Sequence, residues 1–141
     1  MSEIEIREMT LNDYDAVYDL WKHSEGVGLS SADSREAIGR FLAHNPGLCF
    51  TAWQDGGLVG AVMCGFDGRR GYLHHLAVAN HARRQGIGQA LSDRCLQALK
   101  ALGVSKCHIF VYGSNQSGQA FWSAVGWKLR EELVIMSHDI V

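Results

Sequence analysis

Two adjacent arginines and two glycines stand between an apolar stretch and a segment with helical spacing. Arg83 and Arg84 follow the apolar run 76–78, and Gly86 and Gly88 come shortly after them. A helix that begins here presents unpaired backbone N–H groups, and its dipole adds to their attraction for an anion. Glycine lets phosphate oxygens approach the backbone closely, and arginine adds charge-assisted hydrogen bonds. The pattern predicts a cradle for a diphosphate.

Two familiar phosphate-binding motifs do not match the residues of this segment. A dinucleotide fingerprint needs a third glycine where Leu91 stands, and a P-loop needs Gly-Lys followed by Ser or Thr at the start of the helix. A simpler interpretation of this segment alone stays open. The glycines could serve only a sharp turn from strand to helix, with the arginines solvated beside it.

The elements that must hold this segment follow from the spacing of apolar residues. Helices are expected at about 14–21, 34–44, 87–102 and 117–125. Strands are expected at 4–8, 48–53, 58–66, 72–78 and 107–112, with one or two closing strands within 129–140. The order β-α-α-β-β-β-α-β-α-β(β) predicts an α/β fold with one mixed sheet and helices on its faces. We expect one domain over residues 1–141.

The bulk composition excludes several classes of protein. The chain has 141 residues and a formal net charge of −2, so nothing draws it as a whole to nucleic acid or to an anionic membrane. It shows no secretion signal and no apolar run long enough to span a bilayer. Its four cysteines are scattered without a C-x-x-C pair, which predicts reduced thiols in a cytoplasmic protein. No histidine or cysteine pair has zinc spacing, so we expect no metal.

A second segment changes the interpretation of the first. Asn115 is followed by "AFW" at 120–122 and by "GW" at 126–127. This resembles the N-x-x-A-x-x-F-Y-x-x-x-G-F segment of the GNAT N-acetyltransferase family, and Arg83-x-x-Gly86-x-Gly88 resembles its coenzyme A motif. The order of elements matches over essentially the whole chain. The resemblance implies a mostly antiparallel sheet of six or seven strands with about four helices, in which two central strands splay to admit pantetheine.

The resemblance also implies which residues hold acetyl-CoA, the cosubstrate. The diphosphate would lie on the turn and the first helical turn, at Arg83, Arg84, Gln85, Gly86, Ile87, Gly88 and Gln89. The strand edge at Leu76, Ala77 and Val78 would pair with the amides of pantetheine. Asn115 would contact the cofactor from the far wall, or serve only as a helix N-cap. Trp122 would pack on the cofactor arm, or serve only as a core aromatic residue.

The resemblance places the base in the strand 72–78. Alternation along a strand puts Tyr72 and His74 on one face and Leu73 and His75 on the other. Family members that acetylate arylalkylamines have histidines at the positions of Tyr72 and His74, so we expect His74 to relay a proton through water with Tyr72 lining the same cleft. His75 is the second choice, because a bulge would shift the faces. A purely structural histidine is the alternative.

Two departures from the family pattern keep another function open. Phe110 stands where other members carry a glutamate base, and Trp122 stands where many carry a tyrosine that protonates the thiolate. An indole N–H cannot give up its proton at any useful pH. A non-catalytic acyl-CoA-binding module is therefore the main alternative, and a metal-binding or nucleotide-binding α/β protein is a third.

The acceptor is the part of the reaction that the sequence leaves most open. We expect a primary amine of a small molecule or of a peptide or protein, and a monomer or homodimer. The loop at 23–34 matches the variable substrate loop of the family in position, and its Glu25 and Asp33 could attract a cationic amine.

Overall fold

The computed structural model describes residues 2–141. The chain separates into two compact units, residues 1–110 and 111–141, which are described in turn. The assignment of the whole chain to one domain stays a prediction.

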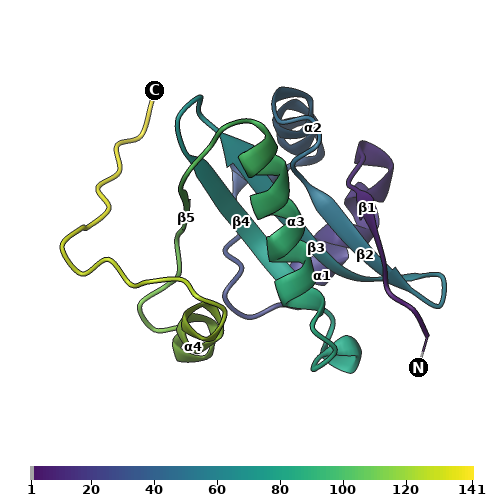
Figure 1. Ribbon diagram of the computed structural model, residues 1–141. Coiled ribbons are helices and arrows are strands. Elements are labelled where there is room, and N and C mark those ends of the chain that lie inside the picture. The colour runs from purple at the N-terminus through teal and green to yellow at the C-terminus, as the bar shows by residue number, and fades with distance from the viewer. Residues whose placement is uncertain (1) are drawn as a thin grey trace. The chain divides into compact units, whose positions relative to one another are not determined.

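The first unit is built on a five-stranded sheet in the order β1-β2-β3-β4-β5 (Figure 1). The strands are β1 (Glu5–Glu8), β2 (Phe50–Gln54), β3 (Gly57–Phe66), β4 (Gly71–Val78) and β5 (Cys107–Ile109). β1 to β4 pair antiparallel, and β4 pairs with β5 in parallel. Between β2 and β3, Asp55 and Gly56 both have positive φ, as the two-residue turn of a tight hairpin requires. The expected mixed, mostly antiparallel sheet is confirmed, with five strands instead of six or seven.

Helices cover both faces of this sheet. They are α1 (Tyr14–Lys22), α2 (Arg35–His44) and α3 (Ile87–Ala101), with short 3-10 helices η1 (Leu11–Asp13), η2 (Ser31–Asp33) and η3 (Asn80–Ala82). A Cβ on Gly60 would contact Ile87 and Leu91 of α3, whereas the next residue of β3, Ala61, belongs to a buried cluster with Trp21 of α1. Since neighbouring residues of a strand face opposite ways, α3 and α1 lie on opposite faces. Phe41 places α2 on the α1 face, because it packs on the same cluster.

β4 and the edge strand β5 part after a short pairing. β4 and β5 share only three residue pairs, Gly71 with Cys107, Tyr72 with His108 and Leu73 with Ile109. β5 therefore ends earlier than the predicted strand at 107–112. In the described chain no strand pairs with the β5-facing edge of β4 beyond Leu73, which leaves the backbone of that edge free at 76–78. The predicted splay is confirmed, although β5 is the edge strand of the five-stranded sheet and not a central one.

The second unit contains one helix, α4 (Gln116–Ala124), among its described elements. The prediction of closing strands within 129–140 is wrong, because these residues form turn and coil. Their apolar residues include Val134 and Met136, which are exposed. Alternating apolar residues make a strand only when the backbone finds a hydrogen-bonding partner, and no strand in residues 2–141 supplies one here.

Candidate active site

A β-bulge in β4 decides where the histidines of this strand point. Across β3, Met63 pairs with His74 and Ala61 pairs with Ala77, so His75 and Leu76 together oppose the single residue Val62. His75 has a φ of 53°, in the left-handed region that histidine adopts more readily than most residues. The extra residue reverses the alternation beyond it.

As a result, His74 and His75 lie on the same side of the sheet. The His74 ring meets Phe41 of α2 edge-on, with ring centroids 5.9 Å apart. The His75 ring meets Trp21 of α1 edge-on, with centroids 4.9 Å apart. The prediction that these two histidines face opposite ways is wrong, and the bulge is the physical reason.

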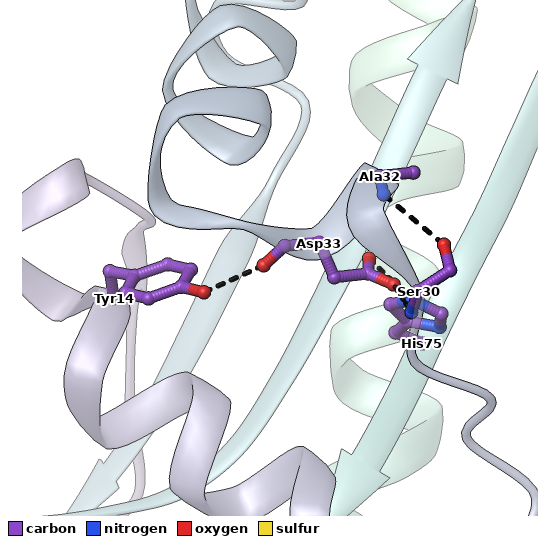
Figure 2. Close-up of polar contacts among 5 residues, drawn as sticks. All are labelled: Tyr14, Ser30, Ala32, Asp33 and His75. Atoms are coloured by element: carbon purple, nitrogen blue, oxygen red, sulfur yellow. Dashed lines mark hydrogen bonds and ion pairs between the residues drawn. The ribbon is translucent and has the colours of Figure 1, made fainter.

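His75 is bound to a buried carboxylate from a distant part of the sequence (Figure 2). Its Nε2 lies 2.8 Å from Oδ1 of Asp33, whose residue is only 4% exposed. The other carboxylate oxygen, Oδ2, accepts the backbone N–H of Ser30 at 3.0 Å. The main-chain carbonyl of Asp33 accepts the hydroxyl of Tyr14 at 2.6 Å. Asp33 is therefore fixed through both its side chain and its backbone.

Sequence reasoning missed this partnership, although it named both residues. Ser30 and Asp33 have the spacing of a capping box, which fixes the turn around η2. That signal predicts the short helix but not the strand across from it. Only the fold brings residue 33 to residue 75.

His74 is half-buried, and its imidazole makes no hydrogen bond to any residue that the structure describes. Burial lowers its pKa below the ordinary value of 6.5. The positive charge that His75 can carry lowers it further, and Asp33 opposes the shift. His74 is therefore neutral near neutral pH, which a proton acceptor requires.

The lowered pKa of His74 predicts a loss of stability in acid. The unfolded chain binds a proton at this residue more readily than the folded one, so the free energy of unfolding falls as the pH drops below about 6.5. His74→Gln should flatten this part of the pH dependence. Urea unfolding of both proteins at pH 7 and at about pH 5.5 measures it. Equal losses in the two proteins would contradict the prediction.

Tyr72 lies at the seam between β4 and β5. Its ring stacks on Phe110, with centroids 6.3 Å apart, and lies 5.6 Å from the ring of His108. Its hydroxyl makes no hydrogen bond within residues 2–141. Tyr72 thus lines the place where the two strands begin to part.

The predicted cradle has the backbone geometry of an anion site. Gly86 is the N-cap of α3 with a φ of 76°, and no side chain caps the helix. Arg84 is also left-handed, with a φ of 66°. Across the described chain, the six consecutive amides from Arg84 to Gln89 donate no hydrogen bond. Such a run of N–H groups in a turn that alternates in hand forms an anion-binding concavity.

Some side chains around the cradle are free to contact a ligand, and others are held by the protein. Arg83 and Arg84 are exposed and form no ion pair with any described residue. Gln85 is held by the protein, since its Nε2 donates to the carbonyl of Ala82 and its amide exchanges hydrogen bonds with Gln54. Ile87 is buried. Gln85 and Ile87 can therefore offer a ligand their backbone only.

Asn115 and Trp122 lie in the second unit. The Asn115 side chain accepts the N–H of Gly118 at 3.0 Å, so it is the N-cap of α4. Trp122 is buried, edge-on to Phe121 and Trp127 at centroid distances of 4.9 and 5.0 Å. These structural roles are confirmed, and contact of either residue with a cofactor stays a prediction.

A hollow of about 360 Å³ lies in the first unit between α1 and the end of β4. Its polar lining includes Asp19, His23 and His81. Of the predicted site residues only Val78 reaches it. The hollow therefore adjoins the end of β4 but includes neither the histidine pair nor the cradle amides.

Other chemistry finds little support in the part of the chain that the structure describes. No group of three or more His, Cys, Asp or Glu residues there is placed to hold a metal ion. The four cysteines are unbridged, and burial raises the pKa of the Cys49 thiol to about 11. A thiol of that kind is a poor nucleophile. None of the helices within residues 2–141 has the length and apolar character needed to cross a membrane.

Comparison with known proteins decides the family. The model of the acetyltransferase (GNAT) family matches residues 14–127. An acetyltransferase of Pectobacterium atrosepticum is 36% identical over 114 residues, which cover 81% of this chain and 80% of that protein. This chain belongs to the GNAT acetyltransferase family.

Solved structures show that the fold of this GNAT acetyltransferase is shared. The PaiA N-acetyltransferase of Thermoplasma acidophilum, in complex with coenzyme A, has a TM-score of 0.80 at 20% identity and covers 92% of both chains. The aminoglycoside N-acetyltransferase AAC(6′)-Iy, in complex with a bisubstrate analogue, has a TM-score of 0.78 at 18% identity. It covers 99% of this chain and 100% of its own. At these identities the likeness concerns the fold.

Proposed function

We propose that this GNAT acetyltransferase transfers the acetyl group of acetyl-CoA to a primary amine within a ternary complex. The observation that carries the proposal is the set of six unpaired amides from Arg84 to Gln89 at the N-terminus of α3. They fit a diphosphate, and Arg83 and Arg84 add two unpaired positive charges beside them.

The edge of β4 between the cradle and the histidines suits the pantetheine arm of the cofactor. The unpaired edge of β4 at Leu76, Ala77 and Val78 offers backbone groups to the two amides of pantetheine. Leu76 lies in the bulge next to His75. Its N–H would polarise the thioester carbonyl, an effect worth a few kcal/mol in acyl transfer. Asn115 and Trp122 stay proposed as further contacts of the cofactor.

With the cofactor so placed, the reaction requires only direct attack of the amine on the thioester. The amine nitrogen forms a bond to the thioester carbon, the carbon–sulfur bond breaks, and the nitrogen loses a proton to one of the two histidines that β4 presents on its α1 side. The thiolate takes its proton from solvent, because the indole of Trp122 cannot supply one. A thiol with a pKa near 8.5 is an adequate leaving group without a dedicated acid.

A small molecule with a primary amine is the acceptor that we propose. AAC(6′)-Iy was solved with a CoA conjugate of acetylneamine, and an aminoglycoside acetyltransferase from a soil metagenome was solved with sisomicin. Both proteins share the fold of this chain. A peptide amine is the second acceptor class to be tested.

An acceptor screen tests the proposal directly. Acetyl-CoA is supplied with neamine, a linear diamine or a lysine peptide, and the release of free thiol is followed. We expect thiol release that depends on one of these amines, and calorimetry should detect acetyl-CoA binding. Tight binding of acetyl-CoA without release on any amine would instead support a non-catalytic acyl-CoA-binding module. Absence of binding would overturn the proposal altogether.

A further inference from the structure

The geometry points to the Asp33–His75 pair, and not to His74, as the group that accepts the proton of the attacking amine. Asp33 is then a positioning residue that acts through His75. The inference rests on the proposed acetyl transfer, and it assigns a role to a residue of the loop between α1 and α2.

The hydrogen bond to Asp33 fixes which nitrogen of His75 is basic. An ionised carboxylate only accepts hydrogen bonds, so the Nε2 atom that lies 2.8 Å from Asp33 must carry a hydrogen. In the neutral imidazole the lone pair is then on Nδ1. Nδ1 makes no hydrogen bond with any residue in the described chain. It is therefore the free atom to which a proton can be delivered.

The same carboxylate compensates the charge that follows. When Nδ1 takes a proton, His75 becomes a cation whose Nε2–H already points at Asp33. Figure 2 shows that Asp33 approaches from η2 while Tyr14 holds its backbone from α1. No dipole has to turn during the reaction, because both carboxylate oxygens are already bonded. The pair is preorganised for this step.

His74 lacks each of these features. It has no acidic hydrogen-bond partner among residues 2–141, and burial opposes its charged form. A proton on His75 opposes it further. Where two neighbouring histidines lie in such different environments, the one with a carboxylate partner carries the positive charge. His74 stays neutral, and its imidazole is left to form a hydrogen bond in the site.

The proton balance is complete with these groups. The amine forms the new nitrogen–carbon bond, its proton passes to Nδ1 of His75, and the carbon–sulfur bond breaks with the electron pair going to sulfur. Solvent protonates the thiolate. After the products leave, His75 returns its proton to solvent, and Asp33 neither gains nor loses a proton in this sequence.

Asp33→Asn tests the assignment with little change in shape. We expect kcat for the best amine of the acceptor screen to fall about 100-fold, with KM for acetyl-CoA unchanged. His75→Gln should lose as much, and His74→Gln less than about tenfold. Asp15→Asn, which removes a surface carboxylate of α1, is the matched control and should keep the original rate.

Two further measurements separate this role from a merely structural one. Hydroxylamine is largely neutral at neutral pH and gives up its proton easily after attack, so the defect of Asp33→Asn should shrink severalfold with it as acceptor. Long-range nitrogen–proton NMR spectra of labelled histidine should show the Nε2–H form of His75 in the original protein. In Asp33→Asn the Nδ1–H form should gain population, because an amide N–H can donate to Nε2.

The outcomes are distinct. Full kcat in Asp33→Asn, an equal defect with hydroxylamine, or a larger loss in His74→Gln than in His75→Gln would overturn the inference and leave the acetyltransferase proposal standing. If the unmodified protein binds acetyl-CoA but releases no thiol with any amine, the proposed function fails and the inference falls with it. Melting curves show whether each variant is folded when it is assayed.

Discussion

Replacement of Gly86 by valine is expected to weaken the binding of coenzyme A about 100-fold, which corresponds to about 2.8 kcal/mol. Gly86 has a φ of 76°, and a β-branched residue adopts that conformation only at high cost. The turn must therefore change shape, and the amides from Arg84 to Gln89 lose the arrangement that we propose for the diphosphate. Loss of one or two charge-assisted hydrogen bonds accounts for an effect of this size. Calorimetry with coenzyme A alone measures it without any acceptor.

Gly47 provides the matched control for this substitution. Its φ is 77°, and a Cβ there, as at Gly86, would have no atom within 4 Å. Gly47→Val should therefore cost similar stability while leaving coenzyme A affinity unchanged, because Gly47 lies in the turn between α2 and β2. Equal affinities in the two variants would mean that the diphosphate binds elsewhere.

Gly71→Ala is expected to destabilise the fold by about 2 kcal/mol. Gly71 begins β4, and a Cβ on it would clash with Cδ1 of Leu99 in α3 and lie 2.9 Å from its Cδ2. Leu99 is itself buried, so its side chain has little room to withdraw. Urea unfolding gives the loss. Gly57→Ala, where the nearest atom to a new Cβ would be 3.8 Å away, should cost much less.

A double-mutant cycle tests the cause of that loss. Leu99→Ala alone should cost about 2–5 kcal/mol through the cavity that it leaves. In the double variant the new methyl group enters this cavity. The double variant should therefore lose less stability than the sum of the two single losses, by about 1 kcal/mol or more. Strict additivity would show that the conformation of the backbone, and not contact with Leu99, is what Gly71 protects.

Much of the fold could be predicted because each element carries its own signal. The period-two pattern of β1, the hairpin turn at Asp55 and Gly56, and the apolar stripe of α3 from Ile87 to Leu99 are local. The prediction of closing strands was wrong because a strand does not depend on local signals alone. The segment 129–140 has apolar residues with strand character but needs a partner backbone, and no local pattern reports whether one is present.

The candidate site divides in the same way. The turn proposed as the cradle could be predicted because its glycines and arginines stand close together in the sequence. The histidines could be named but not oriented, since the bulge depends on how β4 pairs with β3. The link between Asp33 and His75 spans 42 residues and exists only in the folded chain. In the sequence, Asp33 is only one of the acidic residues of a loop.

The paired amides of Gln85 and Gln54 have a consequence for recognition. They tie the turn before α3 to β2, so the turn already has a fixed shape. Ordering a free loop would cost about 1–2 kcal/mol for each residue. Since the turn is anchored in advance, coenzyme A bound as we propose would meet a rigid surface. Removal of the hydrogen bonds between Gln54 and Gln85 should leave the same contacts to coenzyme A available. It should also slow the association of coenzyme A and speed its dissociation.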